Sequence, residues 1–200
     1  MTDVDDAVAA IESGRLAIVP TDTVYGLAAT PFSEDAVRRL YLAKGRVEQQ
    51  PTALVVHDLE RLRGCLPELT GSEERVAGAL LPGPYTLVVP NPARRFAWLG
   101  GSRPETIGVR IPALTGAADD LLARVGALVA TSANLPGGPD PRTLDDVPAE
   151  LRAAAEAVLD GGELPGTPST VVDLTGSEPR VLREGAVPAD EALRVVASVL

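Results

Sequence analysis

Residues 19–27 read VPTDTVYGL. It continues an apolar run, LAIV at 16–19, whose composition predicts a short buried strand. Three small polar side chains, Thr21, Asp22 and Thr23, follow where that strand should end. An ordinary turn needs only one or two such residues. Open α/β sheets bind their ligands at strand ends. The stretch therefore predicts a sheet with a ligand site at this edge.

Strand and helix patterns alternate along most of the chain on either side of this stretch. Strands are predicted over 15–20, 52–57, 86–90, 106–112, 126–131, 169–174 and 179–184. Helices are predicted over 4–13, from the N-cap Ser33 to Gly45, from Ser72 to about 82, and over 116–125, 148–159 and 188–200. The last two strands should pair around the turn at 175–178, which argues against a purely parallel sheet. We therefore predict a mixed α/β (α+β) fold, with residues 1–200 forming a single domain.

The composition excludes several classes of protein. The net charge of the 200 residues is −10, whereas proteins that hold nucleic acid over a broad surface are basic. One cysteine rules out an internal disulfide framework, and one histidine argues against a histidine-based metal site. The acidic N-terminus does not resemble a signal peptide, and no apolar run approaches the roughly 20 residues of a membrane helix. We expect a cytoplasmic protein with no membrane contact.

Three cations stand out because of where they occur. Lys44 is the only lysine among 18 basic residues, which indicates either a site that requires a compact ammonium group or chance. Arg110 lies in the middle of the apolar strand IGVRIP, where a buried guanidinium needs an anionic partner. That partner is either an internal carboxylate or the carboxylate or phosphate of a ligand. Arg183 ends another apolar strand. Together with the hydroxyls at strand ends, these residues predict an anion-lined cleft without a glycine-rich phosphate loop.

Several motifs occur in the order and spacing of a known family. They are PTDTVYGL, AKGR, PGPYTLVV, GVRIP, TSAN and STVVDL…VLREGAV. Over about residues 10 to 190 the chain resembles the YrdC-like family. The resemblance implies a twisted, open mixed sheet flanked by helices, with a concave ligand face. It also implies a nucleotidyltransferase that makes threonylcarbamoyl-AMP and pyrophosphate from L-threonine, bicarbonate and ATP. The Mg²⁺ would arrive with ATP, without a metal site of the protein's own.

The resemblance also implies partners beyond the small substrates. A downstream enzyme would pass the threonylcarbamoyl group to tRNA, so tRNA contact by this chain should be weak or indirect. Two other functions remain open. One is an enzyme of the same fold that handles another carbamoyl adenylate. The other is a non-catalytic RNA-binding module, which the acidic charge disfavours.

The resemblance assigns roles to individual residues. It places ATP against Lys44, Arg46, Gln50, Thr106, Ser132, Asn134, Asp140 and Arg183. It places L-threonine against Thr23, Arg110, Ala130 and Ser169. Lys44 and Arg46 would do the catalytic work of neutralising charge on the phosphates.

The sequence departs from the family pattern at four positions. Val47 replaces a common proline, Gln50 an asparagine, and Val55 a histidine that some members have. Asp140 would repel phosphate unless a metal ion or a ribose lies between them.

Overall fold

The chain folds around one mixed sheet, seen in a computed structural model that describes residues 3–45 and 50–200. The strands are β1 Ala17–Pro20, β2 Tyr25–Ala29, β3 Ala53–Val56, β4 Tyr85–Pro90, β5 Thr106–Arg110, β6 Ala127–Ser132, β7 Ala157–Val158, β8 Thr170–Asp173 and β9 Arg180–Arg183. Their order in the sheet is β7-β1-β2-β6-β3-β5-β4-β8-β9. Three neighbouring pairs, β1–β7, β3–β5 and β4–β8, are parallel and the others are antiparallel. The predicted mixed α/β fold is confirmed.

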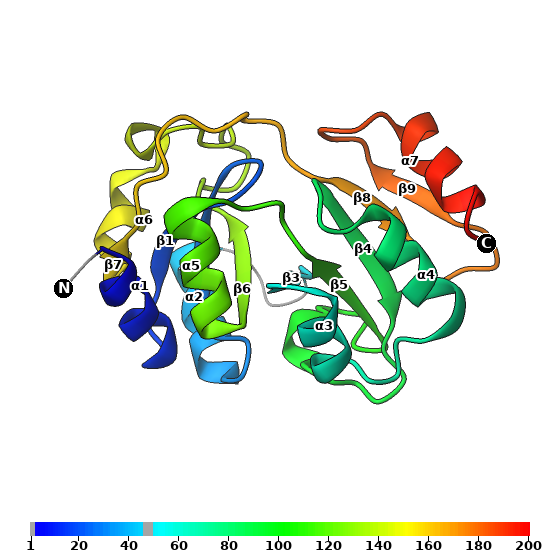
Figure 1. The fold of residues 1–200 in the computed structure, drawn as a ribbon. Coiled ribbons are helices and arrows are strands. Elements are labelled where there is room, and N and C mark those ends of the chain that lie inside the picture. The colour runs from blue at the N-terminus through cyan, green and yellow to red at the C-terminus, as the bar shows by residue number, and fades with distance from the viewer. Residues whose placement is uncertain (1–2, 46–49) are drawn as a thin grey trace.

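Helices flank both halves of the sheet (Figure 1). The α-helices are α1 Asp3–Glu12, α2 Glu34–Ala43, α3 Leu59–Cys65, α4 Gly71–Leu80, α5 Gly116–Val125, α6 Ala149–Ala154 and α7 Ala189–Ala197. Two short 3-10 helices, η1 Ala97–Leu99 and η2 Leu144–Asp146, fall in the long irregular stretches. The α1 and α5 helices pack against each other, as do α4 and α7. Within the described residues, no helix is long and apolar enough to cross a bilayer.

Strand alternation builds two cores, one on each side of β1 and β2. Ile18 and Leu27 belong to the larger core with residues of α2, whereas Val19 and Ala28 belong to the smaller core with residues of α1 and α5. In β4, Leu87 joins the larger core, which also contains residues of α4 and α7. Neighbouring side chains of β4 therefore point the other way, and this side of the strand forms the wall of a cavity.

The stretch at 19–27 forms a hairpin, and its second strand was not predicted. Residues 21–24 connect β1 to the antiparallel β2, so the polar side chains lie in the hairpin loop. The sequence YGLAA contains residues that are poor strand formers in isolation. These residues form a strand because the segment is buried between β1 and β6, where every residue of β2 is buried. Tertiary packing therefore overrides the local preference.

The helices differ from the prediction in two places. The helix predicted over 148–159 ends at Ala154, because the backbone beyond it pairs with β1. The Glu156 N–H donates to the Leu16 carbonyl at 2.8 Å, and the Leu159 N–H to the Ile18 carbonyl at 2.9 Å. Helix α3 was not predicted, although Asp58 caps it by accepting from the Arg61 N–H at 2.7 Å.

Candidate functional site

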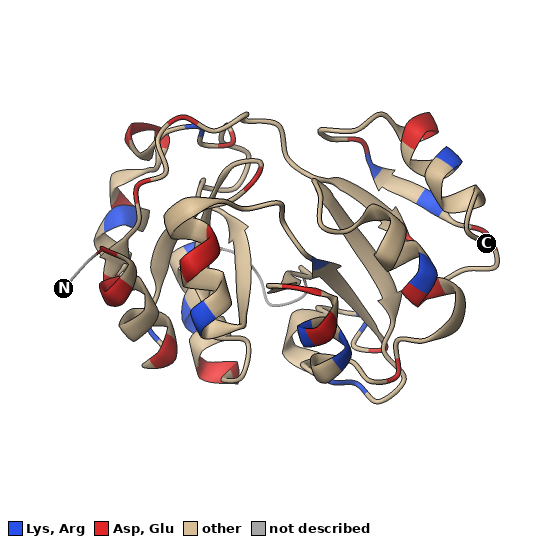
Figure 2. Cartoon of the chain, viewed as in Figure 1, with Lys and Arg blue, Asp and Glu red and all other residues tan. Residues whose placement is uncertain are grey.

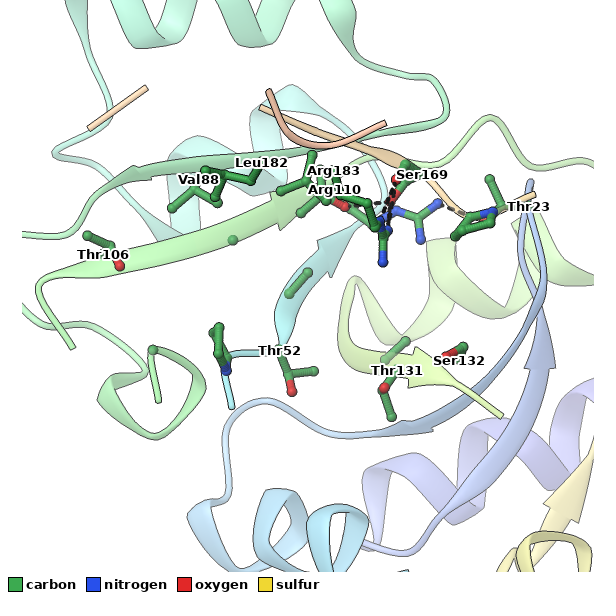
Figure 3. Close-up of a pocket in the computed structure, with 18 of the residues that line it drawn as sticks. Thr23, Thr52, Val88, Thr106, Arg110, Thr131, Ser132, Ser169, Leu182 and Arg183 are labelled. Carbon is green, nitrogen blue, oxygen red and sulfur yellow. Dashed lines mark hydrogen bonds between the residues drawn. The ribbon is translucent and has the colours of Figure 1, made fainter. Parts of the chain in front are cut away.

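A cavity of about 360 Å³ lies where the two halves of the sheet meet, a volume that suits a small-molecule ligand. Its walls come from the β1–β2 loop, from β3, β4, β5, β6, β8 and β9, and from the segment before β5. Figure 3 shows ten of the lining residues by name. Eight predicted site residues line it: Thr23, Thr106, Arg110, Ala130, Ser132, Asp140, Ser169 and Arg183. The fold therefore gathers most of the predicted site, over 160 residues of chain, into one place.

A row of small residues forms the floor of the cavity. Ala130 pairs with Ala53, Ala53 with Gly108, and Gly108 with Val88, across four adjacent strands. All four residues line the cavity. A Cβ at Gly108 would lie 3.5 Å from the Ala53 Cα, which is ordinary contact. The backbone at Gly108 therefore does not require glycine. The missing side chain leaves open space in the cavity above it.

Gly108→Val should therefore block the cavity without weakening the fold. Its methyl groups would occupy ligand space, and valine favours strands. We expect ATP, the ligand that the resemblance implies, to bind about five- to 100-fold more weakly, as overpacking costs about 1–3 kcal/mol. Calorimetric titration and thermal melting of the same variant would measure both properties. Gly108→Ala should show a smaller loss of binding. A large drop in melting temperature with unchanged ATP binding would show that Gly108 does not line the ligand site.

Arg110 has an internal partner and also lines the cavity. Most charged residues lie on helices and loops, while the strands are largely uncharged (Figure 2). The Arg110 Nη2 donates to Asp22 Oδ1 at 2.7 Å and to Thr23 Oγ1 at 3.3 Å. The other oxygen of Asp22 accepts from the Ala113 N–H at 3.2 Å. The side chains are 14% and 7% exposed, so water reaches little of the pair. Of the two partners that the sequence left open for Arg110, the internal carboxylate therefore exists.

A second guanidinium lies close to this pair. The Arg183 Nη2 donates to the Ser169 carbonyl at 2.8 Å and to the Ser169 hydroxyl at 3.2 Å. The same hydroxyl lies 2.8 Å from Thr86 Oγ1. Within residues 3–45 and 50–200, Arg183 forms no ion pair. One end of the cavity therefore carries two arginines against the single carboxylate of Asp22, next to several hydroxyls.

The charges at this end are held at an electrostatic cost. Burial lowers the pKa of Arg110; the attraction of Asp22 opposes this fall, and repulsion by Arg183 adds to it. Burial also raises the pKa of the Asp22 carboxyl, against the attraction of Arg110. A carboxylate or phosphate brought here by a ligand would stabilise both guanidinium groups. The arrangement therefore favours binding of an anion.

Lys44 lies behind the cavity wall. It caps the C-terminus of α2 and is buried. Its ammonium donates to the Ser132 carbonyl at 2.6 Å, to the Asn134 Oδ1 at 2.8 Å, and to the Asn134 carbonyl. The Ser132 hydroxyl also donates to Asn134 Oδ1, at 2.8 Å. Lys44 thus fixes the turn from Ser132 to Asn134 at the end of β6, called the SxN turn below. Ser132 itself lines the cavity. A direct contact of Lys44 with ATP stays a prediction.

The remaining predictions fall outside the lining. Arg46 and Val47 lie outside the described residues, so their roles stay predictions. Gln50 is exposed, and neither it nor Asn134 is part of the lining. Val55, at the position of the family histidine, is buried and paired in register with Arg110. The valine therefore places an apolar side chain where a polar one would stand beside Arg110.

Sequence reasoning missed several cavity residues, among them Thr52 and Thr86, and the partner of Arg110. Thr52, just before β3, and Thr86, in β4, line the cavity, and Asp22 binds Arg110 from outside the lining. Each of the two threonines begins an apolar strand sequence, a pattern too common to single either of them out. Asp22 belonged to the polar stretch that predicted a ligand site, but it was not predicted as the partner of Arg110.

One wall of the cavity is a single irregular segment that includes η1. Gly100 lines the cavity, and the Leu99 carbonyl accepts from the Thr52 N–H at 2.9 Å. Trp98, on the same segment, points to the other side, where its indole N–H donates to the Pro31 carbonyl at 3.1 Å. Its ring lies 6.2 Å from that of Phe96. The segment is thus held from both sides.

Comparisons with known proteins show which proteins this chain is similar to. The sequence model of the Sua5/YciO/YrdC family, described as "Telomere recombination", matches residues 9–185. The chain is 35% identical over 190 residues to "Threonylcarbamoyl-AMP synthase" of Pyrococcus abyssi, covering 94% of this chain and 56% of that protein. It is 36% identical over 191 residues to "Putative threonylcarbamoyl-AMP synthase" of Mycobacterium tuberculosis, covering 95% of this chain and 87% of that protein. The chain thus spans little more than half the length of the Pyrococcus relative.

A solved structure is similar to the whole fold. The crystal structure of P. abyssi Sua5 complexed with L-threonine superposes with a TM-score of 0.89 at 33% identity. The match covers 100% of this chain and 59% of that one.

Proposed function

The chain belongs to the Sua5/YciO/YrdC family, and from this premise we propose that it makes threonylcarbamoyl-AMP and pyrophosphate from L-threonine, bicarbonate and ATP. The observation that carries the proposal is the end of the cavity with two arginines, Arg110 and Arg183, against one carboxylate. All three substrates are anionic or carry an anionic group. A Sua5 structure of the same fold is titled as a complex with L-threonine, which supports the choice of amino acid.

The cavity offers distinct surroundings to the two larger substrates. We assign the threonine carboxylate to Arg110, near Thr23, Ala130 and Ser169. Arg183 lies between this position and the rest of the cavity and would meet the phosphates of ATP, with Arg46 from outside the described residues. The nucleoside would extend toward Thr106, away from the arginines (Figure 3).

The chemistry needs positioning more than a nucleophile from the protein. The threonine amine attacks carbon dioxide derived from bicarbonate and gives a carbamate. A carbamate oxygen then attacks the α-phosphorus of ATP, and pyrophosphate leaves. The protein holds the three reactants together and stabilises the negative charge that develops on the phosphates. The second step transfers an adenylyl group to the carbamate, which makes the proposed enzyme a nucleotidyltransferase.

Magnesium fits the cavity as a companion of ATP. Within the described residues, no three His, Cys, Asp or Glu side chains gather to hold a metal ion. Asp140 is the only carboxylate among the described lining residues, and its Oδ1 accepts from Asn134 Nδ2 at 3.4 Å. Mg²⁺ commonly uses one or two carboxylates together with substrate phosphates. Asp140 would therefore hold Mg²⁺ or face the ribose, and the ion would neutralise charge on the phosphates.

The other functions are less well supported. The curated relatives described above are named for threonylcarbamoyl-AMP synthesis, which favours neither another carbamoyl adenylate nor a non-catalytic RNA-binding module. We propose that a downstream enzyme receives the product for tRNA modification and that tRNA contact by this chain is weak or indirect. A cytoplasmic location stays a prediction.

The assay that tests the proposal measures pyrophosphate release with each substrate omitted in turn. Because the carbamate forms only from both co-substrates, release should require L-threonine and bicarbonate together with ATP. Serine and carbamoyl phosphate would replace threonine in parallel reactions. Equal release without threonine or without bicarbonate would rule out the proposed reaction, and activity with carbamoyl phosphate would favour the other adenylate.

A further inference from the structure

Two buried polar atoms of the described residues lack any hydrogen-bond partner, and both belong to residues that line the cavity. They are Arg110 Nε and Thr52 Oγ1. Arg110 uses another nitrogen on Asp22, so its side chain is partly satisfied. The hydroxyl of Thr52 is its side chain's only polar group. Such buried, unpaired hydroxyls are rare in native proteins because they cost stability.

The burial of Thr52 is fixed by its surroundings. Thr52 directly precedes β3 and is 5% exposed. The Thr52 N–H donates to the Leu99 carbonyl at 2.9 Å, which ties it to the cavity wall formed by the η1 segment. A valine would have the same shape without an unpaired oxygen. The chain instead keeps a hydroxyl at a lining position.

Thr170 shows how this fold normally treats a buried threonine. It is buried, as Thr52 is, but its hydroxyl donates to the Val187 carbonyl at 2.6 Å. The same oxygen accepts from the N–H groups of Gly185 and Val187, each at 3.1 Å. Thr170 does not line the cavity. The unpaired threonine hydroxyl therefore occurs where a ligand can supply the missing partner.

The neighbours of Thr52 indicate which part of a ligand this is. In Figure 3, Thr52 lies across the cavity from Arg110 and Arg183. Ala53, Val88 and Gly100, which also line the cavity, carry no charge. Arg103 is the one cation in the lining besides these two arginines among the described residues, and its Nε lies 3.5 Å from Glu105. Phosphate and carboxylate groups should therefore collect at the other end, which leaves an uncharged group for Thr52.

We propose that the Thr52 hydroxyl is a specificity contact to the nucleoside part of the nucleotide. A hydroxyl both donates and accepts, so it can pair with a base edge or with a ribose hydroxyl. This inference rests on the proposed use of ATP and adds a residue to it. The ligand contact completes the hydrogen bonding of Thr52, and the cost of the unpaired hydroxyl in the free protein is recovered on binding.

Thr52→Val tests the inference, with Thr170→Val as the matched control. Loss of one hydrogen bond should weaken binding of a non-hydrolysable ATP analogue about three- to tenfold. The melting temperature of ligand-free Thr52→Val should stay the same or rise, because an unpaired buried hydroxyl is removed. Thr170→Val should lower the melting temperature, since it leaves the two N–H donors without their acceptor. Thr52→Ser should retain most of the nucleotide affinity.

Analogues of the nucleotide identify the group that is bound. Triphosphates of 2′-deoxyadenosine and of inosine each alter one polar feature of ATP. The loss of affinity caused by the relevant change should disappear in Thr52→Val, because the contact is already gone. Unchanged affinity of Thr52→Val, or equal losses for both analogues in variant and wild type, would overturn the role of Thr52. Failure of the wild-type protein to bind ATP would instead overturn the proposed function.

Discussion

Arg110→Ala is expected to lower both the stability of the protein and its use of threonine. Removing the guanidinium leaves the Asp22 carboxylate buried without its cation, and Asp22 is 7% exposed. Breaking a buried pair in this way costs about 3–5 kcal/mol of unfolding free energy. The same change removes the proposed partner of the threonine carboxylate. The requirement for threonine should rise by at least about tenfold, since losing a buried charge partner costs roughly 2–5 kcal/mol of binding. Denaturant unfolding and pyrophosphate release would measure the two losses.

The two effects can be separated with a second variant. Asp22→Asn combined with Arg110→Met removes both charges, so no carboxylate is left buried alone. Stability should recover in large part, as replacing a whole buried pair often costs little. The threonine requirement should not recover, because the guanidinium is still missing. If the double variant regained threonine use, Arg110 would hold the fold without contacting the substrate.

Acid should lessen the stability loss of Arg110→Ala. The pKa of Asp22 is already raised above 3.8 by burial, and loss of Arg110 would raise it further. An acid whose pKa is raised in the folded state contributes stability that is fully present below its unfolded value and is lost as pH rises through the folded one. The difference in stability between variant and wild type should therefore shrink as pH falls toward 3.8. A pH series of thermal melts would record this trend.

Lys44→Ala is expected to be the second most damaging change. It removes the ammonium that binds the carbonyls of Ser132 and Asn134 and the amide oxygen of Asn134. These acceptors would lose a charged donor in a buried place, at a cost on the order of 3 kcal/mol. The SxN turn should then loosen, and ATP use should fall because Ser132 lines the cavity. Denaturant unfolding and the KM for ATP would measure the two changes.

Lys44→Arg and Ser132→Ala serve as controls for this interpretation. An arginine keeps the charge but cannot place its planar fork where a compact ammonium donates to three oxygens, so rescue should be partial. Ser132→Ala keeps the carbonyl that Lys44 binds and removes only the hydroxyl, so stability should change little while ATP use falls. Normal stability and activity in Lys44→Ala would show that the single lysine has no special role.

The sequence was sufficient to predict the site residues that lie at the ends of strands. The motifs named eight cavity residues, among them Arg110 in the apolar strand IGVRIP. Local patterns could not reveal the partner of Arg110, because Asp22 is 88 residues away in the chain. For the same reason the helix predicted beyond Ala154 was wrong, since its neighbour β1 comes from the other end of the sequence.

The unpaired hydroxyl of Thr52 was also beyond a sequence argument. A threonine beside an apolar strand is common, and its significance depends on which atoms surround it. Only the position of the Leu99 carbonyl and of the cavity wall shows that the hydroxyl is buried and without a partner in the described chain. Residues of this kind become visible when every buried polar atom is paired in three dimensions.

The anchored segment with η1 gives this protein a built-in optical signal. Trp98 is the only tryptophan of the chain, so its emission comes from one place. Two residues further along, Gly100 lines the cavity, while the indole sits on the opposite side of the same wall. Indole fluorescence depends on the polarity and motion of its surroundings, and neighbouring Phe96 and the Pro31 carbonyl set both. We therefore expect occupancy of the cavity to change the emission of Trp98, which intrinsic fluorescence of the unlabelled protein would measure without a coupled reaction.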